Sequence, residues 1–69
     1  MQVRSMITGT VIEICVQAGS AIRCGDELMV IQSMKMDIPV KSPGDGVIQL
    51  LAVSPGGVVN EGDLLAEIA

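Results

Sequence analysis

Lys35 has the clearest chemical potential in this sequence, because it is one of only two lysines and stands between Met34 and Met36. A lysine is in most proteins a solvated surface charge, so its surroundings decide what the amine does. The methionines are unusual here, since the segment around them is predicted to be a turn, where Gly, Asn or Pro are favoured. Two interpretations are open: the methionines fold back onto the core, or their flexible thioether chains form a recognition surface for a modifying enzyme or partner.

The other residue types exclude most catalytic chemistry. The chain has no histidine and no close cysteine pair, so a zinc site has too few ligands and the usual general base is missing. Cys15 and Cys24 could pair with each other, but without a secretory signal we expect free thiols in a reducing cytosol. The sequence therefore predicts a cytoplasmic protein without enzymatic activity of its own.

Charge and hydropathy narrow the class of partner. Eight acidic residues against four basic ones give a net charge of −4, which argues against nucleic acid and against a polybasic membrane anchor. No apolar run approaches the ~18 residues of a membrane span. Hydrophobic residues make up 49% of the 69 positions without one aromatic ring, so Val, Ile, Leu and Met must form the core. We expect one domain over residues 1–69.

An internal repeat organises the chain. When the sequence is shifted by 37 positions, residues 3–32 align without a gap with residues 40–69, and nine pairs are identical. Three of these are the glycine pairs Gly9/Gly46, Gly19/Gly56 and Gly25/Gly62, and glycine's backbone freedom is typical of turns. This spacing indicates a duplication.

Each copy contains short β-branched stretches separated by Gly, Pro and Asp, which is typical of an all-β fold. The expected strands are Gln2–Met6, Thr10–Val16, Ala21–Ile22 and Leu28–Ile31 in the first copy, and Ile38–Lys41, Val47–Val53, Val58–Val59 and Leu64–Ile68 in the second. Two such copies predict a flattened β-barrel or sandwich of two four-stranded antiparallel sheets related by a pseudo-twofold axis.

One detail of the alignment conflicts with strict alternation. Ile12-Glu13-Ile14 aligns with Gln49-Leu50-Leu51, so the polar position moves by one residue between the copies. A β-bulge in one copy would explain the shift, and imperfect alternation is the other possibility.

The segment 33–39 is the only internal stretch without a partner in the repeat. The pseudo-twofold axis places this linker at one end of the domain and the chain termini at the other. Lys35 is then at the tip of a hairpin between the two copies.

The run Ser33-Met34-Lys35-Met36, followed by Asp37-Ile38-Pro39 and Gly46-Val47-Ile48, resembles the biotin-attachment signature of biotinyl domains, commonly Ala-Met-Lys-Met. The turns at Gly9-Thr10-Val11, Gly19, Gly25-Asp26, Gly56 and Gly62-Asp63 also fall where that family has its turns, so the resemblance covers essentially the whole chain. Gln32, Ser33, Ser5 and Thr8 depart from the common pattern, but none of them removes the acceptor amine.

The resemblance implies a biotin carboxyl carrier. Lys35 would carry covalent biotin, added by a biotin protein ligase that reads Met34, Met36 and Ser33, and would shuttle a carboxyl group between biotin carboxylase and carboxyltransferase. Two alternatives stay open. A lipoyl carrier shares the fold but typically has its lysine in an Asp-Lys-Ala setting, and an unmodified β-sandwich adaptor would share the architecture alone.

Overall fold

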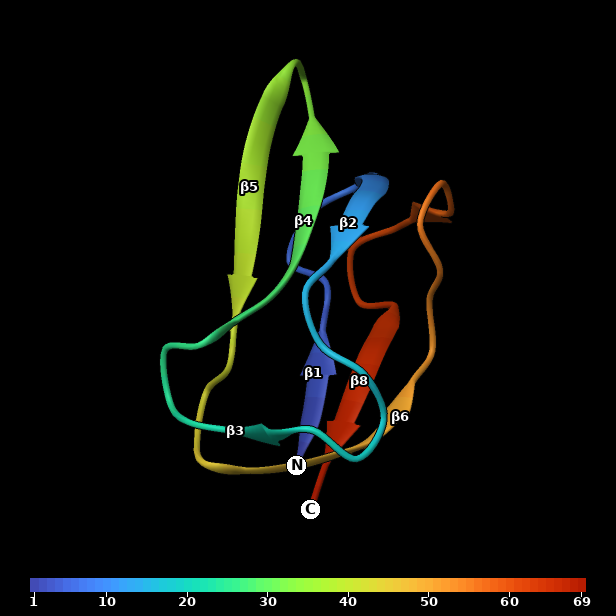
Figure 1. Ribbon diagram of the computed structural model, residues 1–69. Helices are drawn as coiled ribbons and strands as arrows, with labels where there is room; N and C mark the ends of the chain where they lie inside the picture. The colour runs from blue at the N-terminus through green and yellow to red at the C-terminus, as the bar shows by residue number, and fades with distance from the viewer.

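The computed structural model describes residues 1–69 and contains only β-strands and turns (Figure 1). The eight strands are β1 (Gln2–Arg4), β2 (Gly9–Ile14), β3 (Ala21–Ile22), β4 (Glu27–Ser33), β5 (Met36–Lys41), β6 (Gly46–Leu51), β7 (Val58–Val59) and β8 (Leu64–Ile68). All eight expected strands are present. β1, β2 and β6 end two residues early, whereas the pairing of β4 with β5 continues into the linker as far as Ser33 and Met36.

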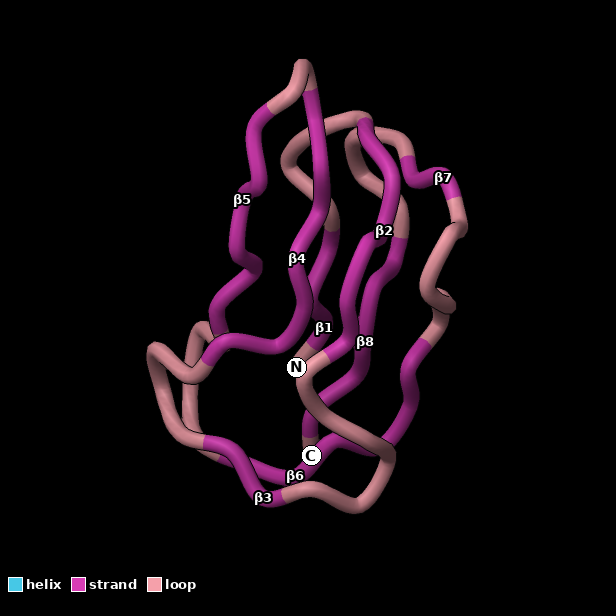
Figure 2. Tube along the Cα trace, turned by 45° about the horizontal axis from the view of Figure 1, so that its top comes forward, coloured by secondary structure: helices cyan, strands magenta, loops and turns pink.

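The strands form two four-stranded antiparallel sheets, as the repeat predicts. Their orders are β1-β8-β6-β3 and β5-β4-β2-β7. The 37-residue shift converts one order into the other, so the two sheets are copies related by a pseudo-twofold axis. The two sheets face each other as a flattened barrel (Figure 2). The fold class expected from the sequence is confirmed.

The β-bulge is present in both copies, so of the two explanations left open by the sequence, a bulge in one copy is excluded. The register of β2 on β4 slips between Val11 and Glu13, and that of β6 on β8 slips between Ile48 and Leu50. In each copy the bulge turns two successive residues towards solvent, and the burial patterns of the two strands agree from the third residue onwards. Because both bulge positions face solvent in each copy, a polar residue fits at either of them. This explains why the polar residue is Glu13 in the first copy but Gln49, one position earlier in the alignment, in the second.

Eleven buried apolar residues form the core between the sheets, and none is aromatic. Most of them are repeat mates, and the fully buried pairs are Val11/Ile48, Leu28/Leu65, Met29/Ala66 and Ile31/Ile68. Burying these branched side chains on both sheets provides the main stabilisation of the fold. The β4–β5 hairpin extends beyond this core at one end, and both termini lie at the other end (Figure 1).

Candidate functional site

The tip of the β4–β5 hairpin is a two-residue loop made of Met34 and Lys35. Ser33 pairs with Met36 across its base. Both loop residues have positive φ, 51° for Met34 and 65° for Lys35, which is the signature of a type I′ turn. Every other residue with positive φ in the chain is a glycine. The tip is therefore a two-residue turn formed by methionine and lysine, two residue types for which a positive φ is unfavourable.

We expect the substitution Met34→Asn to stabilise the fold. Asparagine is preferred at the first loop position of a type I′ turn, whereas a side chain such as methionine costs about 1 kcal/mol in the left-handed region. The melting temperature should rise by a few degrees in thermal unfolding followed by circular dichroism. Met36→Asn is the matched control, because Met36 lies in a strand and should gain nothing. An unchanged or lower melting temperature for Met34→Asn would contradict the strain assigned to this turn.

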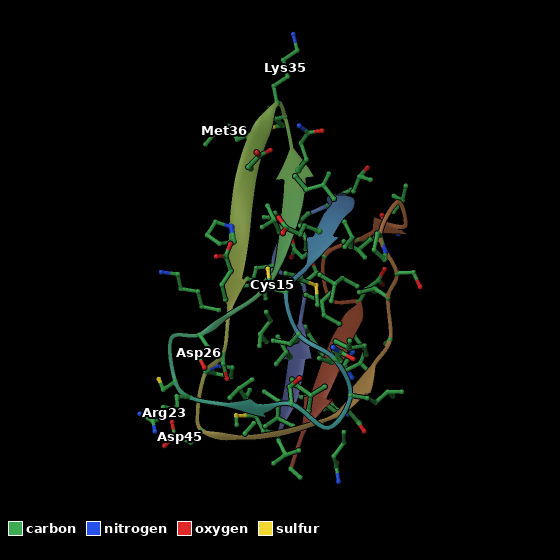
Figure 3. All side chains as sticks on the ribbon, in the orientation of Figure 1. Cys15, Arg23, Asp26, Lys35, Met36 and Asp45 are labelled. Atoms are coloured by element: carbon green, nitrogen blue, oxygen red, sulfur yellow. The ribbon has the colours of Figure 1, made fainter.

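The side chains at the tip point away from the core. Met34 is 92% exposed and Met36 is 62% exposed, so neither methionine folds back onto the core. The Lys35 side chain extends from the apex of the hairpin away from the barrel (Figure 3). The tip thus presents a primary amine between two solvated thioether chains, which is the arrangement the recognition-surface interpretation requires.

Hydrogen bonds fix the base of the hairpin while the apex stays free. The Ser33 hydroxyl donates to the carbonyl oxygen of Thr8 at 2.8 Å, which ties the hairpin to the loop between β1 and β2. On the outer face, the Gln32 amide lies 3.4 Å from the Asp37 carboxylate. The sequence marked Thr8 only as a departure from the family's pattern, and its separation of 25 positions from Ser33 leaves no local signal of the contact.

Gly9, the first residue of β2, permits close packing beneath the hairpin. A methyl group at this position would overlap the carbonyl oxygen of Gln32 and lie 2.8 Å from Cγ2 of Ile31. The repeat gave a signal here, since Gly46 is the mate of Gly9 and packs in the same way against Ala69 and Ile68. Both strands approach their neighbours at a distance only glycine allows.

No catalytic group accompanies the tip amine. Both cysteines are free and exposed, and no group of three or more His, Cys, Asp or Glu side chains is arranged to hold a metal ion. Desolvation, and then the carboxylates of Glu13 and Glu27, raise the pKa of the Cys15 thiol above its usual value. A raised pKa lowers the thiolate fraction, so Cys15 is not an activated nucleophile. The structure also has no helix with the length and hydrophobicity to span a bilayer.

A small β-barrel with a lysine at the apex of a protruding hairpin is the architecture of a carrier domain that holds a prosthetic group. Residues 1–68 match the sequence profile of the family described as "Biotin-requiring enzyme", the biotin and lipoyl attachment domains. The chain belongs to the biotin/lipoyl attachment family.

Individual relatives agree with this assignment. The chain is 42% identical over 67 residues to the biotinylated protein TB7.3 homolog of Mycobacterium leprae, covering 97% of this chain and 94% of that protein. It is 39% identical to the biotin-dependent acyl-coenzyme A carboxylase alpha3 subunit of the same organism, covering 96% of this chain but 11% of the subunit. A solved single-chain, multi-domain long-chain acyl-CoA carboxylase superposes with a TM-score of 0.90 at 32% identity, over 96% of this chain and 6% of that one.

These comparisons confirm three predictions made from the sequence. The chain is a biotinyl carrier domain, its cofactor is covalently bound biotin, and it corresponds to the non-catalytic carrier part of biotin-dependent carboxylases.

Proposed function

We propose that residues 1–69 form one biotinyl domain in which Lys35 carries biotin and moves a carboxyl group between two active sites of a carboxylase. The observation that supports this most is the exposed Met34-Lys35-Met36 tip, held beyond the barrel by a strained two-residue turn. Lys41, the other lysine, lies in β5 on the side of the barrel and has no such setting.

The chemistry of attachment follows from the amine. Its nitrogen attacks the acyl carbon of biotinyl-adenylate, an amide bond forms, AMP departs with the electrons of the broken acyl–oxygen bond and the amine loses a proton. The attack requires the amine to lose a proton, so a biotin protein ligase supplies the base as well as the activated acid. The product has lost one positive charge, and the formal net charge of the chain changes from −4 to −5.

The bound cofactor supplies a ureido nitrogen that accepts and releases the carboxyl group, and the protein supplies position. The rigid barrel and the free apex of the hairpin suit this task, because a short tether raises the effective concentration of the group to roughly millimolar at each site. The proposed partners are therefore a biotin protein ligase, a biotin carboxylase and a carboxyltransferase. We propose that the chain acts in the cytoplasm and binds neither nucleic acid nor a membrane.

Met34 and Met36 are proposed to be the surface that the ligase and the carboxylase components recognise, with Ser33 holding the base of the turn. Met34→Asp or Met36→Asp should lower the rate of biotin incorporation about tenfold or more, because burying a carboxylate at the ligase interface costs over 1.4 kcal/mol. The melting temperature should not fall, since both side chains are exposed. Val47→Asp is the matched control: its side chain is 42% exposed and lies in β6 beside the C-terminal residue Ala69, at the end of the barrel opposite the tip. A large drop in melting temperature with normal incorporation would instead indicate a structural role.

A carboxylation assay tests the proposed function. The biotinylated chain is incubated with biotin carboxylase, ATP and radiolabelled bicarbonate, and acid-labile label on the chain is measured. We expect label that depends on both ATP and biotinylation. A chain that carries biotin by mass but accepts no label would contradict the carrier role.

A further inference from the structure

A groove of about 360 Å³ lies between the edge strands β1 and β5, where the two sheets meet on the pseudo-twofold axis. Its floor contains the buried side chains of Val3 and Ile31, and its walls contain the half-buried Ile7, Ile38 and Val40. This volume is within the range of small-molecule sites, which are mostly apolar with a few polar groups. Neither the carrier chemistry nor the packing of the core requires this groove to be open.

The lining of the groove is not symmetric. Ile38 and Ile7 line it, whereas Met1 and Gly44, which lie 37 positions away from them in the sequence, do not. The Met1 side chain covers Gly44, since a methyl group on Gly44 would lie 3.0 Å from Cε of Met1. The Met1 side chain thus occupies space over Gly44, while on the hairpin side Ile38, three residues after Lys35, lines the groove.

The biotinyl arm is long enough to reach this space. Ile38 is three residues below Lys35 along β5, a distance of about 10 Å in a strand. Eleven bonds separate the lysine Cα from the bicyclic ring, and a chain of this kind extends roughly 14 Å. An arm folded back along β5 therefore places the ring level with the upper wall of the groove.

Two cations line the same groove. Arg4 and Lys41 are repeat mates on β1 and β5, and they are two of only four basic residues in the chain. The Arg4 guanidinium donates to the Gly62 carbonyl oxygen at 2.9 Å and to the Gln2 side-chain oxygen at 3.0 Å, both of them uncharged acceptors. Its remaining N–H groups, and the exposed ammonium of Lys41, are suited to donating to a ureido oxygen.

We propose that this groove is a resting site for the chain's own prosthetic group, in which the biotin ring packs on Ile38 and Val40 and its ureido oxygen accepts from Arg4 or Lys41. This inference rests on the proposed attachment to Lys35. The apolar contact is small and the arm loses rotational freedom on docking, so the folded-back state is held weakly and releases readily. The site thereby shields the ring between visits to the carboxylase without trapping it.

Nuclear magnetic resonance of the unmodified and biotinylated chains tests the proposal. We expect amide shifts in residues 3–7 and 38–41 as well as at the tip, and nuclear Overhauser contacts between ring protons and the methyl groups of Ile38 and Val40. Lys41→Gln should reduce the chemical-shift changes of the groove residues by about half or more. The substitution removes one charged donor and so favours the state in which the arm is free. Arg23→Gln, which removes a cation outside the groove, should leave them unchanged.

The outcomes separate the two proposals. Intact mass of the same sample reports whether one biotinyl group was added. A biotinylated chain whose shifts are confined to residues 33–37, with no contacts to the ring, overturns the resting site and leaves the carrier function in place. A chain that gains no biotinyl group overturns both.

Discussion

Lys35→Ala abolishes the incorporation of biotin while the melting temperature stays within a degree or two of the original, because the residue is an exposed tip position. The variant still contains Lys41, an exposed amine on β5, so complete loss of label shows that the position and not merely the amine is required. Streptavidin blotting and intact mass measure the modification, and thermal unfolding measures the fold.

Lys35→Arg is the sharper companion to this variant. Arginine keeps the positive charge and much of the stem, yet its guanidinium has a pKa too high to act as the acyl acceptor. It should also accept no biotin. Label that persists on either variant would contradict the assignment of Lys35.

Gly9→Ala lowers the free energy of unfolding by about 3 kcal/mol, the upper part of the range for overpacked cores. The added methyl group overlaps the Gln32 carbonyl oxygen and lies 2.8 Å from Cγ2 of Ile31, and neither β2 nor β4 can move without opening the sheet. A chain of 69 residues is stable by about 3 to 10 kcal/mol, so a substantial fraction of that stability is lost. Urea unfolding followed by circular dichroism measures the change.

Gly44→Ala is the matched control for Gly9→Ala. A methyl group there also meets a close neighbour, but that neighbour is the far end of the flexible Met1 side chain at 3.0 Å, which can move aside. The expected change is about 0.5 kcal/mol or less. Equal losses at both positions would contradict the close backbone approach assigned to Gly9.

The repeat is the reason why the fold could be predicted in detail. Its shift of 37 residues predicted two equivalent sheets, and its unpaired segment predicted the tip at the end opposite the termini. The pairing of Gly9 with Gly46 also marked two positions that turned out to be equivalent in packing. The bulges were placed less well, because sequence alternation cannot show which of two successive exposed residues is the extra one.

Contacts between distant segments were beyond what the sequence could show. The hydrogen bond from Ser33 to Thr8 joins residues that share no local sequence pattern. The pairing of β4 with β5 continues past the repeat to Ser33 and Met36, which the repeat does not indicate. The asymmetry of the groove depends on where the Met1 side chain packs over Gly44. Each of these features is a tertiary arrangement that departs from the symmetry the sequence implies.

Peptide mapping of the unaltered chain by tandem mass spectrometry tests the central claim most directly. The chain is expressed with a biotin protein ligase under biotin-replete conditions, digested with a protease that does not require lysine, and fragmented. We expect one biotinyl group on the chain, located on Lys35 and absent from Lys41. A lipoyl group at Lys35, a biotinyl group elsewhere, or an unmodified chain would contradict it.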